Sequence, residues 1–308
     1  MHSTPLTFAT RPSALARWQT QWVIWALRAA WPDLECVEKV ITTLGDRLFD
    51  RPLPEIGGKG LFTLELEDEL QHGDVQAAVH SLKDLPVENP PGLIVAAIPA
   101  RGEARDVLVS ERGYTLESLP DGARVGTSSL RRSAQLMAQR PDLRIESLRG
   151  NVDTRLRKAG QGLYDAIVLA GAGLIRLGFA EQIGQWLPLE VIMPAPGQGA
   201  LAVQCRDDDA HTLELLAAIE DAPSRMATSA ERAFLKGLGG GCSLPVAAYA
   251  EYQENKIHLH GRVISLDGRQ VMDGQATGED AEELGLECAR QVLAQGASEL
   301  LADIPIRK

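Results

Sequence analysis

The sequence predicts an α/β fold over its first two thirds and a smaller α+β unit after about residue 220. Short β-like runs alternate with amphipathic helical patterns up to that point, an order typical of an α/β sheet. Beyond it, strand-like runs follow one another directly, which indicates antiparallel neighbours. At 308 residues the chain is long enough for two or three domains of roughly 100 to 200 residues each.

The α/β part begins with a strand at Leu6–Ala9, followed by an amphipathic helix within Ser13–Trp31 for which Ser13 is a plausible N-cap. Apolar residues of this helix recur every three or four positions and should form the stripe that faces the core: Leu15, Trp18, Trp22 and Ala26. The other strand candidates, with helices between them, are Val37–Thr42, Ala77–His80, Leu93–Ile98, Val107–Ser110, Arg124–Gly126, Arg144–Leu148, Ala166–Ala170 and Ala200–Gln204.

The C-terminal part opens with helical signals across Ser224–Leu238 and closes with a helix near Asp280–Gln295. Three strand-like runs lie between them: Val246–Ala250, Lys256–Ile264 and Gln270–Thr277. The dipeptide Asp267-Gly268 between the last two runs is a hairpin turn signal. This pattern predicts a small antiparallel sheet with helices beside it.

The overall charge and the cysteine spacing exclude several classes of protein. A formal net charge of −11 argues against a nucleic-acid partner, since duplex binders normally present a net basic face. No run of about 20 apolar residues predicts a membrane span, and no charged leader precedes an apolar signal core, so we expect a cytoplasmic protein. The four cysteines are too widely spaced for a zinc site or a disulfide framework, so neither is expected.

Basic residues gather at five points where a predicted strand gives way to a helix. Each junction combines glycine or a small hydroxyl residue with arginine or lysine: Ala9–Ser13, Gly57–Phe62, Val125–Arg132, Leu148–Arg155 and Ala172–Arg176. Ligands of open α/β sheets collect at the carboxyl ends of strands, and the field of acids elsewhere on the surface fades within about 8 Å. Guanidinium groups bind both oxygens of a carboxylate at once. The five junctions together predict a ligand with several carboxylates, although any one alone could be an ordinary surface arginine.

One acidic residue differs from this basic background. Asp84 follows a predicted strand within Ala78–Pro86, and we expect it to be the one carboxylate among many arginines. An aspartate there would stay ionised and could stabilise a cationic intermediate or relay a proton. The plainer alternative is an ordinary charged turn.

Cys242 lies in a glycine-rich loop, Leu238–Pro245, between a predicted helix and a predicted strand. A cysteine on such a loop is a candidate for covalent chemistry, although most cysteines are buried small hydrophobes. We expect the other three cysteines to be buried small hydrophobes, because they lie in apolar-patterned elements: Cys36, Cys205 and Cys288.

Seven ordered motifs resemble those of the porphobilinogen deaminases, from about residue 6 to residue 250. They are Arg11–Ala16, Gly57–Phe62, His80–Asp84, Gly126–Arg132, Arg149–Arg155, Pro196–Ala200 and Gly240–Cys242. The resemblance implies two doubly wound α/β domains like those of periplasmic binding proteins, plus a smaller α+β C-terminal domain with an antiparallel sheet. It places domain 1 at 1–99 and 200–218, domain 2 at 100–199 and domain 3 at 219–308.

The resemblance also implies a monomeric transferase that joins four porphobilinogen molecules head to tail, with loss of ammonia, and releases hydroxymethylbilane in porphyrin (haem) biosynthesis. Cys242 would carry a dipyrromethane cofactor through a thioether, as a primer and not as a redox centre. Asp84 would be the catalytic aspartate. The residues implied in cofactor binding are Ser81, Lys83, Thr127, Ser129, Arg131, Arg132 and Arg155, and those implied in substrate binding are Arg11, Ser13, Gln19, Lys59, Phe62, Arg149 and Arg176.

The sequence departs from the family pattern at Ala14, where proline is common, and at Leu64, where lysine is frequent. These departures put in doubt only local loop rigidity and one peripheral charge. Two other classes are weighed against the resemblance. A two-lobed, non-catalytic receptor for a small carboxylate would share the architecture, and fold alone does not exclude it. A nucleotide-binding transferase would need a GxGxxG or P-loop pattern after a strand, and Gly57–Gly60 satisfies neither.

Overall fold

A computed structural model describes residues 5–47, 60–240 and 244–302. The chain divides into two compact units: unit 1 comprises Met1–Arg101 and Ala200–Arg225, and unit 2 comprises Gly102–Gly199 and Met226–Arg307. The division into three domains stays a prediction.

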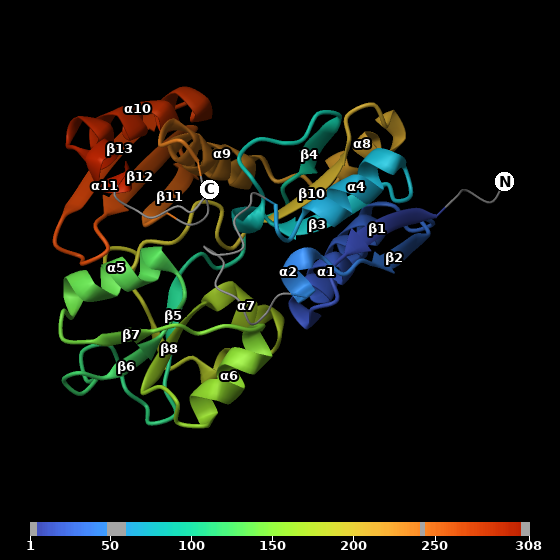
Figure 1. Ribbon diagram of the computed structural model, residues 1–308. Coiled ribbons are helices and arrows are strands. Elements are labelled where there is room, and N and C mark those ends of the chain that lie inside the picture. Colours follow the sequence, from blue (N-terminus) through green and yellow to red (C-terminus); the bar gives the residue numbers. More distant parts are fainter. Residues whose placement is uncertain (1–4, 48–59, 241–243, 303–308) are drawn as a thin grey trace. The chain divides into compact units, whose positions relative to one another are not determined.

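Unit 1 is built on a five-stranded sheet (Figure 1). Its strands are β1 (Leu6–Thr10), β2 (Cys36–Val40), β3 (Ala77–Ser81), β4 (Leu93–Ala97) and β10 (Leu201–Arg206). They lie in the order β2-β1-β3-β10-β4, with β1 parallel to β2 and β3, and with β10 antiparallel to β3 and β4. The carboxyl ends of β1, β2 and β3 therefore meet at one edge of the sheet.

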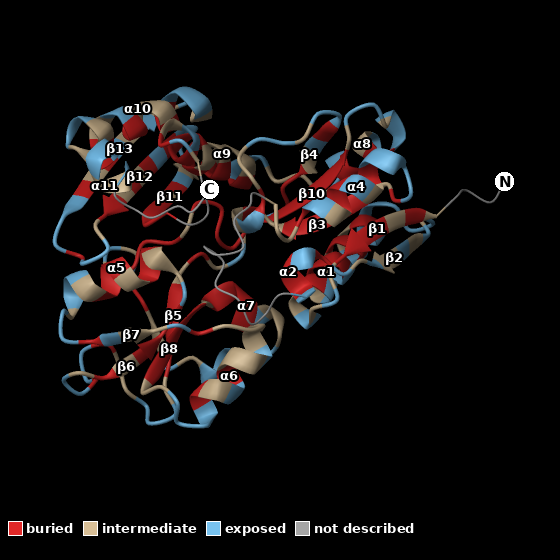
Figure 2. Ribbon diagram, viewed as in Figure 1, coloured by how far each residue is buried: buried red, intermediate tan, exposed pale blue. Residues whose placement is uncertain are grey.

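Helices pack on both faces of this sheet. The helical segments of unit 1 are α1 (Ala14–Ala30), α2 (Leu44–Arg47), α4 (Leu64–His72), the 3-10 turn η1 (Leu82–Asp84) and α8 (Ala210–Ala217). Leu27 of α1 packs with Phe8 on one face, whereas Leu66 and Leu70 of α4 pack with Ala78 on the other. Figure 2 shows that β1, β3 and β10 in the middle of the sheet are mostly buried, whereas the edge strand β2 is not. The predicted doubly wound α/β arrangement is confirmed.

The predicted first helix is present, but its predicted apolar stripe is wrong by about one position. Ser13 caps α1 as expected, since its hydroxyl accepts a hydrogen bond from Ala16 N at 3.3 Å. Trp18 and Trp22 are only half-buried, because smaller side chains further along the helix face the sheet. The buried positions are Ala16, Gln19, Thr20, Val23, Ile24 and Leu27.

Unit 2 contains a second five-stranded sheet. Its strands are β5 (Asp106–Val109), β6 (Arg124–Gly126), β7 (Arg144–Glu146), β8 (Ala166–Ala170) and β9 (Gln185–Trp186), in the order β7-β6-β8-β5-β9. β6 is parallel to β7 and β8, whereas β5 is antiparallel to β8 and β9. The carboxyl ends of β6, β7 and β8 therefore share an edge with the first residue of β5. The two-residue strand β9 was not predicted, since so short a run shows no periodicity.

The helices around this sheet are α5 (Leu130–Gln139), α6 (Val152–Gly160), α7 (Gly171–Arg176) and the 3-10 turn η2 (Ala180–Gln182). Leu136 of α5 packs with Val125 and Val168 in one cluster of buried residues. Leu156 of α6 packs with Ile167 in a second cluster, to which Leu174 of α7 also belongs. Helices on both faces give this sheet the same doubly wound character as the sheet of unit 1.

Unit 2 also contains the predicted antiparallel sheet of the C-terminal part. Its elements are α9 (Ala222–Gly237, in unit 2 from Met226 onward), β11 (Val246–Gln253), β12 (Lys256–Ile264), β13 (Val271–Gly278), α10 (Ala281–Ala294) and α11 (Ala297–Ala302). Gly268 turns the β12–β13 hairpin with a φ of 74°. A Cβ at Gly261 would lie 2.5 Å from the Phe234 ring, so only glycine lets α9 approach β12 this closely. No helix in the described residues is long and apolar enough to cross a membrane.

Candidate active site

Arg11 follows β1 in unit 1 and is held by an aspartate and an aromatic ring. Its Nε lies 3.2 Å from Asp46 Oδ2 and a terminal nitrogen lies 2.5 Å from Oδ1. The guanidinium also lies over Phe62, 4.2 Å from the ring centroid, in a cation–π contact. Burial of Asp46 raises the pKa of its carboxyl, but hydrogen bonds and charge from Arg11, with hydrogen bonds from Thr43, outweigh burial and hold the pKa below its ordinary value. Arg11 is thus fixed in place with its charge balanced.

The end of β3 carries three more of the predicted residues. Ser81 ends the strand, and Lys83 and Asp84 lie in η1 directly after it. The amide of Gln19 on α1 donates to Ser81 Oγ at 2.8 Å, so a predicted substrate-binding residue and a predicted cofactor-binding residue meet here. Leu82 is buried and anchors the turn, whereas Asp84 is exposed. Within the described part of the chain, no ion pair involves the Asp84 carboxylate.

A buried histidine precedes this turn. His80 of β3 is 5% exposed, and burial lowers the pKa of its imidazole to about 4, which the nearby Gln204 side chain offsets only in part. The ring is therefore neutral at pH 7 and adds no positive charge beside Ser81.

In unit 2, hydroxyl groups organise the turn between β6 and α5. Ser129 caps α5, its Oγ accepting from Arg132 N at 3.4 Å, and Thr127 Oγ1 accepts from Ser129 N at 3.2 Å. Ser128 Oγ donates to Leu148 O at 2.9 Å and accepts from Leu148 N at 3.0 Å. These bonds bring two of the five predicted basic junctions side by side, since Leu148 immediately precedes Arg149.

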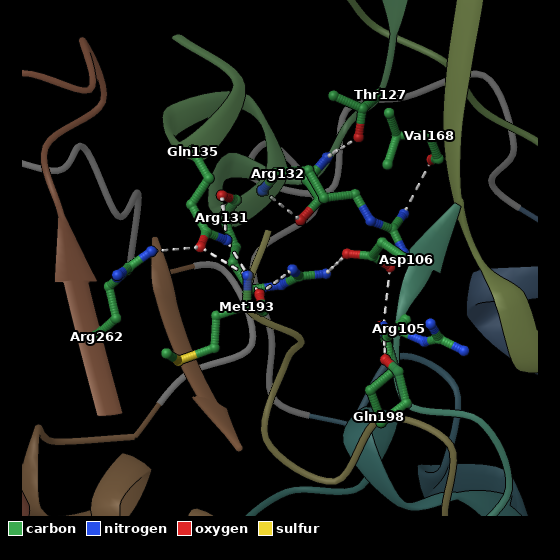
Figure 3. A network of polar contacts seen from close by, with 12 residues as sticks. Arg105, Asp106, Thr127, Arg131, Arg132, Gln135, Val168, Met193, Gln198 and Arg262 are labelled. Carbon is green, nitrogen blue, oxygen red and sulfur yellow. Dashed lines mark hydrogen bonds and ion pairs between the residues drawn. The ribbon is translucent and has the colours of Figure 1, made fainter. Parts of the chain in front are cut away.

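Arg131 and Arg132 share one carboxylate, that of Asp106 at the start of β5 (Figure 3). Arg131 lies 2.9 Å from Oδ2, and Arg132 lies 2.7 Å from Oδ1. The two arginine side chains are only 5% and 7% exposed, and Asp106 is fully buried. Burial lowers the pKa of Arg131, and the charge of Asp106 opposes that effect. The three residues together carry one positive charge in excess.

The other predicted arginines of unit 2 lie after β7 and β8. Arg149 is half-buried in the turn that follows β7. Arg155 of α6 donates from Nε to Gly150 O at 2.7 Å, and Arg176 of α7 donates to Gly199 O at 2.6 Å. Burial lowers the pKa of Arg176 to about 10, so this guanidinium is still cationic at neutral pH.

The structure corrects the expectation that Asp84 is the one carboxylate among the arginines. Asp46 and Asp106 each bind site arginines, and sequence reasoning missed both. A buried charge needs a partner, so an isolated acid at the head of an apolar run was the signal that could have identified Asp106. Asp46 lies in a short helix with no apolar periodicity, and no comparable signal marks it.

Two predicted residues, Lys59 and Cys242, lie outside the described residues. Of the other cysteines, Cys205 and Cys288 are fully buried as expected, and burial raises the pKa of their thiols to about 11 and about 12. Cys36 is half-buried. In residues 5–47, 60–240 and 244–302, no cluster of three or more His, Cys, Asp or Glu side chains could hold a metal ion.

The fold and the side chains together place the chain in a class of protein. It is an α/β protein with arginines at the ends of its strands, and guanidinium groups are suited to binding carboxylates. The family profile described as "Porphobilinogen deaminase, dipyromethane cofactor binding domain" matches residues 6–214. The profile described as "Porphobilinogen deaminase, C-terminal domain" matches residues 226–294. The chain belongs to the porphobilinogen deaminase family.

Similar proteins carry the same name. A porphobilinogen deaminase of Brevibacillus brevis is 53% identical over 296 residues, which are 96% of this chain and 96% of that protein. One of Syntrophotalea carbinolica is 48% identical over 308 residues, covering 99% of this chain and 98% of its own. One of Moorella thermoacetica is 50% identical over 297 residues, covering 96% and 95%. Among solved structures, the methionine-binding protein MetQ aligns with 70% of this chain and 90% of its own, at 12% identity and a TM-score of 0.46.

Proposed function

We propose that the chain is a transferase, a hydroxymethylbilane synthase, which joins four porphobilinogen molecules head to tail with loss of ammonia. Its product is the linear tetrapyrrole hydroxymethylbilane, used in porphyrin (haem) biosynthesis. The observation that carries the proposal is the match of both family domains along nearly the whole chain. Geometry supports it separately, because porphobilinogen carries two carboxylates and the strand ends carry guanidinium groups that bind such anions.

The dipyrromethane cofactor fits the donors found in unit 2. Its acetate and propionate groups are carboxylates, and Arg131, Arg132 and Asp106 together leave one positive charge in excess. In addition, Nε of Arg132 is buried with no hydrogen-bond acceptor among the described residues. An uncompensated buried charge is costly, so a carboxylate bound beside the pair would stabilise it.

The residues that we assign to the cofactor carboxylates are Ser81, Lys83, Thr127, Ser129, Arg131, Arg132 and Arg155. Cys242 attaches the cofactor through a thioether. When bound, it supplies a free pyrrole α-carbon, the nucleophile to which the first substrate adds. Ser129 and Thr127 already hold the first turn of α5, so both can orient a carboxylate at the helix N-terminus.

The residues that we assign to porphobilinogen are Arg11, Ser13, Gln19, Lys59, Phe62, Arg149 and Arg176. Arg176 keeps its charge at neutral pH despite its burial, and Arg11 is held by Asp46 and Phe62 in one orientation. A fixed guanidinium loses little conformational freedom when it binds a carboxylate, which favours affinity.

Asp84 is the group that we assign to the chemical step. The aminomethyl group reacts as its ammonium form: when the carbon–nitrogen bond breaks, the bonding pair leaves with the nitrogen as ammonia, and the positive charge passes to the pyrrole ring of the substrate. The Asp84 carboxylate, exposed on η1, stabilises that charge. It can then accept the proton that the attacking pyrrole carbon releases as the new carbon–carbon bond forms.

We further propose that the enzyme is a monomer in the cytoplasm, with three domains at 1–99 plus 200–218, 100–199 and 219–308. The antiparallel sheet of residues 246–278, with its own helices, supports a separate third domain. Nucleic acid and metal play no part in the proposed reaction.

Incubation of the purified protein with porphobilinogen tests this function. We expect four molecules of ammonia for each hydroxymethylbilane released, when ammonia is measured enzymatically and the tetrapyrrole by absorbance. A folded protein that binds porphobilinogen at equilibrium without releasing ammonia would instead be a carboxylate receptor. The control is Glu88→Gln, an exposed acid four residues beyond Asp84, which should leave turnover unchanged.

A further inference from the structure

Gln135 holds the main chain of Met193 at both of its polar atoms. On α5, one turn after Arg131, its Nε2 donates to Met193 O at 3.0 Å and its Oε1 accepts from Met193 N at 2.9 Å. Gln135 is 1% exposed, so water does not compete for these bonds. Met193 O also accepts from a terminal nitrogen of Arg131 at 2.6 Å. Gln135 therefore fixes the carbonyl that orients the Arg131 guanidinium.

A second arginine, Arg262 of the antiparallel sheet, contacts the side-chain amide of Gln135 (Figure 3). Arg262 of β12 makes a long 3.5 Å contact to Gln135 Oε1 and donates to Glu190 O at 3.2 Å. Asp273, directly opposite on β13, holds Arg262 in a forked pair at 2.7 and 2.9 Å. Burial raises the pKa of Asp273, but the hydrogen bonds and charges of Arg262 and His260 outweigh burial and keep the pKa well below its ordinary value. Near neutral pH, Arg262 is therefore anchored by an ionised carboxylate.

The segment 190–198 joins the antiparallel sheet to the arginine pair. Besides the bond from Arg262 to its first residue, Ala248 N of β11 donates to Pro194 O at 3.0 Å. At its far end, Gln198 Nε2 donates to Asp106 Oδ1 at 2.8 Å. Two groups hold Arg131, and this segment is connected to both. The carbonyl of Met193 belongs to the segment, and the Asp106 carboxylate accepts a hydrogen bond from its Gln198.

We propose that Gln135 and Arg262 are positioning residues for Arg131, and that through them the antiparallel sheet sets the direction of the Arg131 guanidinium. β11 of this sheet begins four residues after Cys242, so the same sheet follows the cysteine to which we assign the cofactor. Each residue acts through the main chain of Met193. The inference rests on the proposed function, because it gives Arg131 a cofactor carboxylate to bind.

The test follows attachment of the cofactor. Cofactor-free protein, produced in cells that make no porphobilinogen, is mixed with porphobilinogen, and the added mass is recorded over time on the denatured chain. Gln135→Met removes both bonds to Met193 with little change in volume, and Arg262→Met removes the contacts to Gln135 and Glu190. We expect each variant to load about tenfold more slowly than the wild type, equivalent to about 1.4 kcal/mol.

Two controls separate positioning from general loosening. Arg290→Met removes an exposed arginine of α10 that pairs with Glu287, away from this network, and should load at the wild-type rate. Ile257→Val trims a fully buried residue of β12 and should lower Tm while loading normally at 25 °C. Slow loading of Ile257→Val, to the degree seen for Arg262→Met, would overturn the positioning role. Arg262→Lys keeps the charge without the fork and should recover part of the rate.

A double variant tests whether the two residues act through one carbonyl. Gln135→Met combined with Arg262→Met should load little more slowly than Gln135→Met alone, whereas effects that multiply would contradict a shared route. If Gln135→Met does not fold, Arg262→Met with its Ile257→Val control decides the matter alone. Variants that load like the wild type overturn only this inference, whereas a wild-type chain that never gains pyrrole mass overturns the proposed function.

Discussion

Unit 1 and unit 2 use the same local arrangement with a different balance of charge. In unit 1, one arginine after β1 pairs with one aspartate, as Arg11 with Asp46. In unit 2, Arg131 and Arg132 share the single carboxylate of Asp106. The side chain of Arg11 is 20% exposed, whereas those of Arg131 and Arg132 are 5% and 7% exposed.

The ratio of arginine to aspartate decides what each site can do. A one-to-one pair is electrically complete, so it fixes the direction of Arg11 without demanding another anion. A two-to-one cluster leaves a buried positive charge, and an incoming carboxylate removes the cost of burying it. The cluster in unit 2 therefore has an uncompensated positive charge for a carboxylate, whereas the Arg11–Asp46 pair in unit 1 has none.

The largest expected effect comes from Asp106→Asn. Without the shared carboxylate, two buried arginines repel each other, and breaking such a buried pair costs about 3–5 kcal/mol of unfolding free energy. Asp46→Asn should cost clearly less, because Arg11 can turn toward water and Thr43 can still bond the new amide. Urea unfolding of both variants checks this difference. Equal losses would remove the distinction between the two sites.

The next largest effect concerns the acid of unit 1. Asp84→Asn should lower kcat at least 100-fold, about 2.7 kcal/mol, since a neutral amide neither stabilises a cation nor accepts a proton. Tm should stay within a degree or two of the wild type, because Asp84 is exposed and belongs to no ion pair in the described ranges. Steady-state kinetics and thermal unfolding provide the two measurements. A variant that keeps wild-type turnover would take the acid–base role away from Asp84.

Arg149→Ala should separate substrate binding from cofactor attachment within unit 2. We expect chain extension to require about tenfold more porphobilinogen, while the cofactor still attaches, because Arg149 is assigned to the substrate and Arg131 to the cofactor. Intact mass gives the loaded fraction, and initial rates give KM. Loss of the attached cofactor in Arg149→Ala would show that this arginine serves the other ligand.

The smallest expected effect is a pH dependence specific to unit 1, which contains His80, the one buried histidine among the described residues. Its folded pKa of about 4 lies below the ordinary 6.5, so between these values the unfolded chain binds more protons and stability falls as pH falls. Between pH 6.5 and pH 5.5 the loss should be about 1 kcal/mol. Urea unfolding of wild type and His80→Leu at both pH values should show this loss only in the wild type. A variant as sensitive to pH as the wild type would assign the loss to other groups.

Much of the fold could be predicted from the sequence, because periodicity and turn residues report local structure directly. β6, β8 and β12 were predicted to the residue, and α10 (Ala281–Ala294) lies within the helix predicted near Asp280–Gln295. The orientation of α1 could not be predicted in the same way. The apolar spacing predicted that a stripe with two tryptophans faces the core. In the structure smaller side chains face the sheet instead, because the burial of α1 depends on how its side chains pack against the strands, which is a tertiary property.

The candidate site was predictable as a set of basic strand ends but not as a set of charge pairs. Arginine and hydroxyl residues at strand ends are visible in the sequence, and the structure brings the ends of β6 and β7 together through Ser128. The partners Asp46 and Asp106 lie 35 and 26 residues from Arg11 and Arg132, and no local pattern connects them. The sequence likewise did not indicate a role for Gln135, because that role depends on a contact with Met193, which is 58 residues away.

The mass of the denatured chain, for the wild type and for Cys242→Ser before and after porphobilinogen is added, tests the central claim most directly. The account predicts a wild-type chain that carries two pyrrole units and grows by single pyrrole units, and a folded serine variant that carries none. A folded wild-type chain whose mass matches the bare sequence and never changes would contradict the account and leave a carboxylate receptor as the better interpretation.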